Sequence, residues 1–306
     1  MENNPALAEC KNLLYLGAHQ AAINKLNNLV KTSSGETQIE AKLLLIRAYL
    51  AQGKYNSASN ECQNIRESAY GDLQAAATNL TLYLQARYQS GKTEMLPALV
   101  ADCHRNLKEN ENSITNPIFV YLTSALLLHA GEYEEAMKLL ALHPENIECF
   151  ALMVQAYLAI NRSDMAEQLC LRTKKLFEDS VIYQLCEAWT CCYSAAGAKA
   201  DRAFYTFEEL SLSSTGTSIS LLVSQAVSKL HMGQYPEADG ILLEALDKDN
   251  NNGNVLSNLA ISSVLNDKDS YKNYVNQLRE QNPHHPFIAD IDEKASLFDS
   301  AAKVFE

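Results

Sequence analysis

The stretch that decides the fold is "QGKYNSA" at residues 52–58, because its spacing of Gly, Tyr and Ala returns along the chain. The pattern recurs as "AGEYEEA" at 130–136 and as "MGQYPEA" at 232–238. Glycine lacks a Cβ and so adopts the left-handed conformation that ends a helix. The small Ala that follows lets a second helix approach the first closely. The pattern therefore predicts pairs of antiparallel helices joined by tight turns.

The pairs repeat with a period in the mid-thirties. Successive gaps between the pattern's alanines are 36, 78, 30, 37 and 35 residues, and the long gap is expected to hide one degenerate pair near "SGKTEML". About 34 residues per helix-turn-helix is the tetratricopeptide period. The alanines that mark the repeat are Ala22, Ala58, Ala136, Ala166, Ala203 and Ala238.

We therefore predict an all-α, tetratricopeptide-like solenoid of helical hairpins, a superhelix that could close into a ring. Residues 1–282 are expected to form about eight helix pairs, and residues 283–306 a C-terminal capping helix after the break "NPHHPF". Capping elements shield the open end of a solenoid from solvent. The first helix of each pair is expected near 6–16, 37–52, 72–90, 116–130, 146–160, 180–196, 218–232 and 252–266.

Composition excludes several classes of function. The chain of 306 residues has a net charge of −12, and no basic block exceeds two residues, which argues against nucleic acid as a partner. The N-terminus lacks the pattern of a signal peptide, and no apolar run approaches the ~20 residues that cross a bilayer. We expect a soluble, intracellular protein whose eight cysteines are reduced and mostly buried.

Motifs that could carry chemistry fail in detail. "SGKT" at 90–93 resembles the end of a phosphate-binding loop, but Ala86 stands where such a loop needs Gly. "DKDNNNGNVLSN" at 247–258 resembles a calcium loop, but Asn252 and Asn258 replace its Gly and Glu. The histidines form no catalytic or zinc arrangement. We expect no enzyme activity, no metal and no cofactor, and we interpret these segments as turns and helix caps.

The first helix of each tetratricopeptide pair lines the inner face of the superhelix. Counting 13, 10, 6 and 3 residues back from the closing turn of a unit identifies its inward positions. The last inward position is Leu in five units, whose turns are placed at Gly53, Gly131, Asn161, Gly233 and Lys268. The Lys, Arg and Asn set that clamps peptide carboxylates is missing. The candidate partner-binding residues are Leu50, Tyr121, Leu128, Leu158, Val223, Val227, Leu230 and Leu265.

An apolar inner face has two interpretations. It can be an interaction surface for a helix or hairpin of a partner, since exposed apolar patches mark such surfaces. Alternatively, a tightly wound superhelix packs these side chains against its own helices. The sequence alone is consistent with both interpretations.

Three long segments resemble one family. They are "HPENIECFALMVQAYLAINRSDMAEQLC" at 143–170, "HMGQYPEADGILLEALDKDNNNGNVLSNLA" at 231–260 and "NPHHPFIADIDEKASLFD" at 282–299. They are similar to the epsilon subunits of coatomer, the COPI vesicle coat, and the resemblance covers essentially the whole chain. The sequence departs from the repeat pattern at "GKTEML" and at "GAKADRA".

The resemblance implies a non-catalytic scaffold that curls around the C-terminal domain of coatomer alpha and stabilises it, with the other coatomer subunits as indirect partners. It implies retrograde Golgi-to-endoplasmic-reticulum and intra-Golgi transport. The expected location is cytoplasmic, peripheral on Golgi membranes and COPI-coated vesicles, with membrane contact only through the coat. The alternative is a co-chaperone-like adaptor for linear peptide tails, against which the missing clamp argues.

Overall fold

The described part of the chain is helical throughout. The computed structural model describes residues 4–65, 68–193, 199–213 and 218–303, which form α-helices with short 3₁₀ and π-helical turns and no strand. The end of the helix predicted at 180–196 lies outside these residues. The all-α prediction is confirmed.

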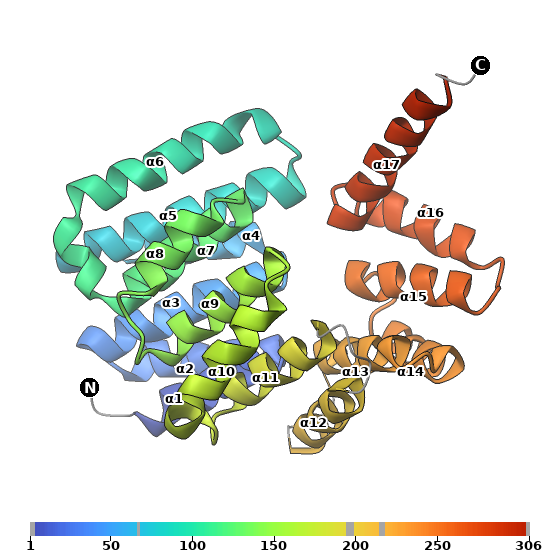
Figure 1. Ribbon diagram of the computed structural model, residues 1–306. Helices are drawn as coiled ribbons and strands as arrows, with labels where there is room; N and C mark the ends of the chain where they lie inside the picture. The colour runs from blue at the N-terminus through green and yellow to red at the C-terminus, as the bar shows by residue number, and fades with distance from the viewer. Residues whose placement is uncertain (1–3, 66–67, 194–198, 214–217, 304–306) are drawn as a thin grey trace. The chain divides into compact units, whose positions relative to one another are not determined.

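Antiparallel helices follow one another in pairs, as predicted (Figure 1). The eight first helices begin within two residues of the predicted starts. The pairs are α1 (Pro5–Tyr15) with α2 (His19–Thr32), α3 (Gly35–Ala51) with α4 (Tyr55–Gln63), α5 (Gly71–Leu84) with α6 (Leu96–Glu109), α7 (Pro117–Ala130) with α8 (Tyr133–Leu140), α9 (Ile147–Ala159) with α10 (Ser163–Phe177), α11 (Val181–Tyr193) with α12 (Ala200–Ser213), α13 (Ile219–His231) with α14 (Tyr235–Lys248), and α15 (Gly253–Leu265) with α16 (Tyr271–Gln281). A last helix, α17 (Pro286–Ala302), follows them.

The chain divides into two compact units, residues 1–218 and 219–306. The boundary falls between the sixth and seventh pairs, whereas the sequence pattern placed a division at residue 282. That assignment of residues 283–306 as a separate cap stays a prediction.

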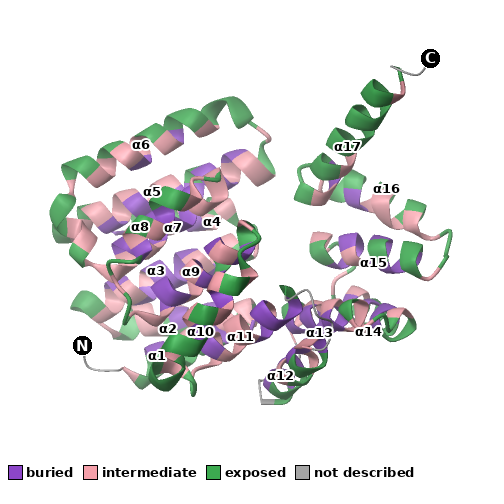
Figure 2. Ribbon diagram, viewed as in Figure 1, coloured by how far each residue is buried: buried purple, intermediate pink, exposed green. Residues whose placement is uncertain are grey.

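Unit 1, residues 1–218, holds α1 to α12, and its buried apolar residues form several clusters. The core is built by small and aliphatic side chains at helical spacing, and its largest cluster runs from Ile39 in α3 to Leu152 in α9. Figure 2 shows this buried surface concentrated where α3, α5, α7 and α9 pack together. The array turns back on its start, because α1 contacts both α3 and α11. Helix α1 of the first pair therefore lies against α11 of the sixth pair.

Unit 2, residues 219–306, holds α13 to α17. Leu222 and Ala226 of α13 pack with Leu242 and Ala245 of α14 and with Val255 of α15. A smaller cluster joins Leu256 of α15, Leu278 of α16 and Ile288 of α17. Ile288 is the only described α17 residue that is buried, so most of this helix is exposed (Figure 2).

The turns within the pairs follow the predicted chemistry. Gly131 ends α7 with φ 84°, and its neighbour Glu132 donates its backbone N–H to Leu127 O at 2.9 Å. Gly53 and Gly233 have the same positive φ after α3 and α13. Asn161 takes this role after α9 with φ 58°, and Asp267 takes it after α15 with φ 55°. Asn and Asp tolerate the left-handed region better than most residues with a Cβ.

The last of these turns corrects the sequence register. The count of inward positions in α15 started from Lys268, but the left-handed residue is Asp267, one position earlier. Counted from Asp267, the positions 13, 10, 6 and 3 residues back are Asn254, Ser257, Ile261 and Val264. The turn was misplaced by one residue because neither Asp nor Lys marks the end of a helix in the sequence as clearly as Gly does.

The degenerate third pair has an irregular turn. Helix α5 continues into a π-helical turn, Gln85–Gln89, and Gly91 with φ 62° leads into a 3₁₀ turn at Thr93–Met95. Further 3₁₀ turns lie at Ser68–Tyr70 and Glu111–Thr115. The "SGKT" motif thus joins two helices, with no strand in the described residues before it. The motif is therefore part of a turn between paired helices, as expected from the sequence.

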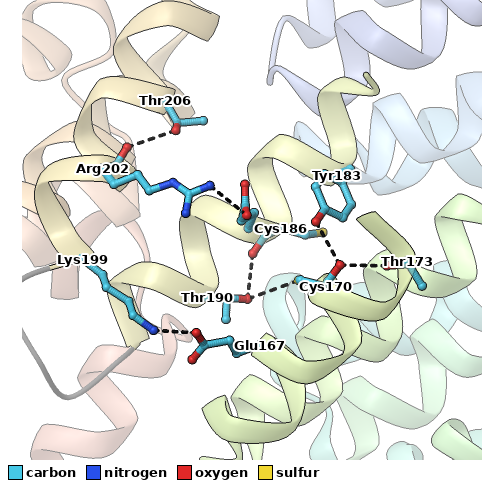
Figure 3. A network of polar contacts seen from close by, with 10 residues as sticks. Glu167, Cys170, Thr173, Tyr183, Cys186, Thr190, Lys199, Arg202 and Thr206 are labelled. Carbon is cyan, nitrogen blue, oxygen red and sulfur yellow. Dashed lines mark hydrogen bonds and ion pairs between the residues drawn. The ribbon is translucent and has the colours of Figure 1, made fainter. Parts of the chain in front are cut away.

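Polar contacts stabilise the last two pairs of unit 1 (Figure 3). The Tyr183 hydroxyl of α11 donates to the carbonyl of Cys170 in α10 at 2.9 Å, and the Thr190 hydroxyl donates to the Cys186 carbonyl at 2.8 Å. Lys199, just before α12, pairs with Glu167 of α10 at 2.6 Å. The two hydroxyl groups are buried and so need these partners, whereas the Lys199–Glu167 pair is partly exposed.

Candidate partner-binding surface

The predicted residues of unit 1 lie on the inner sides of α3, α7 and α9. Leu50, Tyr121 and Leu128 are half-buried and pack against the main core of the unit. Leu158 is only 8% exposed and belongs to the cluster formed by α9, α10 and α11. Leu158 therefore offers little surface, whereas the other three retain part of theirs.

A buried ion pair crosses this inner face. Arg47 of α3 and Glu148 of α9 meet at 2.8 Å, with side chains 15% and 9% exposed. The Arg47 guanidinium also lies 4.1 Å from the centroid of the Tyr121 ring. Tyr15 of α1 donates its hydroxyl to the same oxygen of Glu148 at 2.6 Å. Four helices far apart in sequence are thus joined by one polar cluster, Tyr15–Arg47–Tyr121–Glu148.

The electrostatics of this cluster favour the ionised pair. Burial acts to raise the pKa of Glu148, but the Arg47 charge and the Tyr15 hydrogen bond outweigh it and hold this pKa below its usual value. Burial and the nearby Glu148 carboxylate raise the pKa of Tyr15, so its hydroxyl stays protonated and donates. Asn146 supports the arrangement by accepting from the Glu148 backbone N–H at 3.0 Å at the start of α9.

The sequence contains a signal for this cluster. Arg47 stands 6 residues before Gly53 and Glu148 stands 13 before Asn161, so both were counted at inward positions. Charged residues at these positions were considered only as a clamp for peptide carboxylates. Buried charges need partners. Because Arg47 and Glu148 carry opposite charges at inward positions, their pairing could be predicted from the sequence.

A recess of about 420 Å³ opens beside the cluster. Tyr121 and Leu128 of α7 line it together with Leu152 and Gln155 of α9 and Arg87 from the π-helical turn. Arg87 donates to the carbonyl of His129 near the end of α7, and the Tyr83 hydroxyl donates to the same carbonyl at 3.2 Å. The structure thus brings two predicted residues, Tyr121 and Leu128, to one recess.

The predicted residues of unit 2 lie on α13 and α15. Val223, Val227 and Leu230 of α13 are half-buried, at spacings of four and three that place them on one side of the helix. Leu265 at the end of α15 is 42% exposed. Leu265 lines an apolar groove formed by α15, α16 and α17, to which Ile261 and Val264 also contribute.

Other chemistry is limited in the described residues. They contain no group of three or more His, Cys, Asp or Glu placed to hold a metal ion. Asn252, which stands at the glycine position of a calcium loop, instead caps α15 by accepting from the backbone N–H of Val255 at 3.3 Å. Among the helices of residues 4–65, 68–193, 199–213 and 218–303, none is long and apolar enough to span a membrane.

Solved structures with this fold define its class. A tetratricopeptide repeat protein from Parabacteroides merdae aligns with a TM-score of 0.55 at 16% identity, over 79% of this chain and 92% of that one. The Cut9–Hcn1 hetero-tetramer of the APC/C aligns with a TM-score of 0.60 at 10% identity, over 96% of this chain and 56% of that one. The chain is therefore a tetratricopeptide-like solenoid, a class of fold that presents surfaces to other proteins.

Sequence comparison then gives the family. The profile described as the coatomer epsilon subunit matches residues 3–306. Coatomer subunit epsilon-1 of Arabidopsis thaliana is 32% identical over 98% of this chain and 97% of its own length, and the epsilon subunit of Dictyostelium discoideum is 27% identical over 98% of each. The chain belongs to the coatomer epsilon subunit family, whose members are structural components of the COPI vesicle coat rather than enzymes. Membership implies association with other coatomer subunits.

Proposed function

We propose that this chain binds and stabilises the C-terminal domain of coatomer alpha through the inner faces of its first helices. Family membership supports a partner within the coat. The observation that carries the choice of surface is the half-buried stripe of Val223, Val227 and Leu230 on α13. Aliphatic side chains that keep part of their surface in the unbound chain gain by burial against a partner.

The other proposed contacts lie on first helices of each unit, taken separately. Leu50, Tyr121 and Leu128 keep partial exposure in unit 1, and Leu265 keeps more in unit 2. The buried Leu158 is proposed to act by supporting the α9 face rather than by offering area of its own. The coat that contains this pair is proposed to act in the cytoplasm, on Golgi membranes and COPI-coated vesicles, in Golgi-to-endoplasmic-reticulum and intra-Golgi transport.

Co-purification tests the proposed surface. The double variant Val227→Asp/Leu230→Asp places two charges on the α13 stripe, and we expect it to lose co-purification with coatomer alpha while keeping its helical circular dichroism. Leu171→Asp is the matched control, because Leu171 of α10 is 65% exposed and lies outside the predicted stripe. The control should co-purify like the unmodified chain.

Two results would contradict the proposal. Retention of coatomer alpha by a folded double variant would show that α13 is not the contact surface. Recovery of peptides with free C-termini in place of coatomer alpha would favour the adaptor alternative.

A further inference from the structure

Helix α17 is attached to the rest of unit 2 through its first two turns. Ile288 packs with Leu256 of α15 and Leu278 of α16, and it is the only described residue of α17 that is buried. Arg279 of α16 and Asp292 of α17 form an ion pair with two hydrogen bonds, at 2.7 and 2.9 Å, and both side chains are about half exposed. The position of α17 therefore depends on a few contacts at its N-terminal end.

The imidazole ring of His285 supplies a further contact at this end, against Gly253 at the start of α15. A Cβ added to Gly253 would lie 2.7 Å from Cδ2 of the ring, which is closer than a real Cβ approaches another heavy atom. The same Cβ would lie 3.5 Å from Cδ1 of Leu278 in α16. Glycine is therefore needed at position 253, because the ring occupies the space that a side chain would take.

Hydrogen bonds fix the protonation state of His285. The backbone N–H of Phe287, in the first turn of α17, donates to Nδ1 of the ring at 3.3 Å, so Nδ1 carries no proton. Nε2 lies 3.3 Å from Oδ1 of Asn254 in α15, and this oxygen can only accept. Nε2 therefore carries the proton and donates it. The neutral ring caps α17 and joins this helix to α15.

A proton on Nδ1 would remove this arrangement. An imidazolium donates from both nitrogens, so Nδ1 could no longer accept from the N–H of Phe287. The first N–H groups of a helix have no partner within the helix and depend on such a cap. The partial positive charge of a helix N-terminus also disfavours a cation at this place. Protonation of His285 therefore removes the cap of α17 and adds a repulsive charge where the helix meets α15.

The surroundings of the ring do not compensate a positive charge. Helix α15 has no charged residue, and within residues 4–65, 68–193, 199–213 and 218–303 no carboxylate pairs with His285. The charged and titratable groups on the adjoining segments are Asp249 before α15, Arg279 and Glu280 of α16, His284 beside the ring, and Asp290 and Asp292 of α17. Asp290 and Asp292 are paired with Lys294 and Arg279. Burial lowers the pKa of His285 below its usual value.

We propose that His285 is a pH-sensitive contact that holds α17 against α15 as a neutral imidazole and releases the helix when the ring is protonated. A histidine whose pKa is lower in the docked state than in the free state weakens docking as the pH falls below its ordinary value of 6.5. Above that pH the ring is neutral in both states and docking is strongest. Release exposes Ile288 together with Leu256 and Leu278.

Hydrogen exchange followed by mass spectrometry tests this contact. Peptides that cover residues 287–293 report on the docking of α17, and an unfolded reference measured at each pH corrects for the intrinsic effect of pH on exchange. We expect the protection of these residues to fall about threefold or more between pH 7.5 and pH 5.0. The Arg279–Asp292 pair should persist over this range, because Arg279 holds the pKa of Asp292 below its usual value.

Two neighbouring substitutions separate the contact from other effects of acid. His285→Asn supplies a capping side chain that does not titrate, and we expect the pH dependence of protection in α17 to disappear. His284→Asn is the matched control, because His284 is exposed and adjacent in sequence. This control should keep the full pH dependence.

A titration of the unmodified chain gives a second measurement that does not depend on how well the variants dock. The imidazole resonance of His285 is assigned by its loss in the spectrum of His285→Asn. We expect its titration midpoint to lie below 6.5, the ordinary pKa of histidine, and the loss of protection in α17 to follow the same titration.

Three outcomes would overturn the proposal. Equal protection of α17 at the two pH values in the unmodified chain would show that protonation does not release the helix. A pH dependence that persists in His285→Asn, or that is lost in His284→Asn, would assign it to another group. A titration midpoint of His285 at or above 6.5 would show that the fold does not hold the ring neutral. None of these outcomes bears on the binding of coatomer alpha proposed for α13.

Discussion

At the scale of single residues, the inner face of unit 1 contains a largely buried ion pair, Arg47–Glu148, beside its apolar side chains. Arg47 and Glu148 are removed from solvent, which costs more free energy than their attraction returns unless further bonds satisfy them. The Tyr15 hydroxyl and the Tyr121 ring supply those contacts. The cluster also specifies register, because it forms only when α1, α3, α7 and α9 are correctly placed.

Removing one member of the pair should destabilise unit 1. Arg47→Met leaves the Glu148 carboxylate buried without its ion, and we expect a loss of about 3–5 kcal/mol in the free energy of unfolding. The double variant Arg47→Met/Glu148→Leu removes both charges and should recover most of that loss. Urea unfolding followed by the fluorescence of Trp189, the single tryptophan of the chain and part of α11, reports on unit 1. Equal losses in the single and double variants would contradict the assignment of an interacting pair.

At the scale of the helical pair, turn glycines and helix glycines have opposite roles. Gly131 takes φ 84° at the end of α7, which disfavours every residue with a Cβ. Gly240 lies inside α14, where glycine only adds freedom to the unfolded chain. An added Cβ meets no other atom within 4 Å at either position. Substitution of either glycine by Ala therefore causes no steric clash, so the two variants compare backbone conformation alone.

The same substitution at these two glycines should shift stability in opposite directions. Gly131→Ala forces alanine into the left-handed region and should cost about 1–2 kcal/mol. Gly240→Ala should stabilise by about 0.5–1 kcal/mol, since alanine has the higher helix propensity. Thermal unfolding followed by circular dichroism should show a lower midpoint for the first variant and a higher midpoint for the second. Shifts in the same direction would mean that the turn at Gly131 carries no conformational requirement.

At the scale of the whole molecule, periodic features could be predicted and pairwise contacts could not. The eight first helices follow from the repeat of the Gly-Tyr-Ala pattern and its variants, and the closing helix follows from the break at "NPHHPF". The Arg47–Glu148 pair joins residues 101 positions apart, and no local pattern determines that α3 faces α9. The α15 register failed at Asp267 because a non-glycine residue ends that helix. The groove at α17 depends on how far that helix departs from its neighbours, which spacing does not encode.

Thiol reactivity tests whether the helices of unit 1 pack as described, because all eight cysteines lie in this unit. All eight cysteines are free, and seven are buried. Burial raises the pKa of Cys103 and Cys149 to about 12 and that of Cys170 to about 11. Little reactive thiolate is then present near pH 8, and access is restricted as well.

We therefore expect Ellman's reagent at pH 8 to label about one thiol or fewer per native chain within minutes, because the reagent needs an accessible thiolate. All eight should react in guanidinium chloride, which provides the internal control for complete reduction. Slow labelling of the remaining native thiols should follow opening of the helical pairs that bury them. It should therefore accelerate in Arg47→Met for Cys149, the residue next to Glu148, more than for Cys170 in the α10–α11 contacts. Fast labelling of several thiols in the unmodified chain would mean that the pairs do not shield their cysteines.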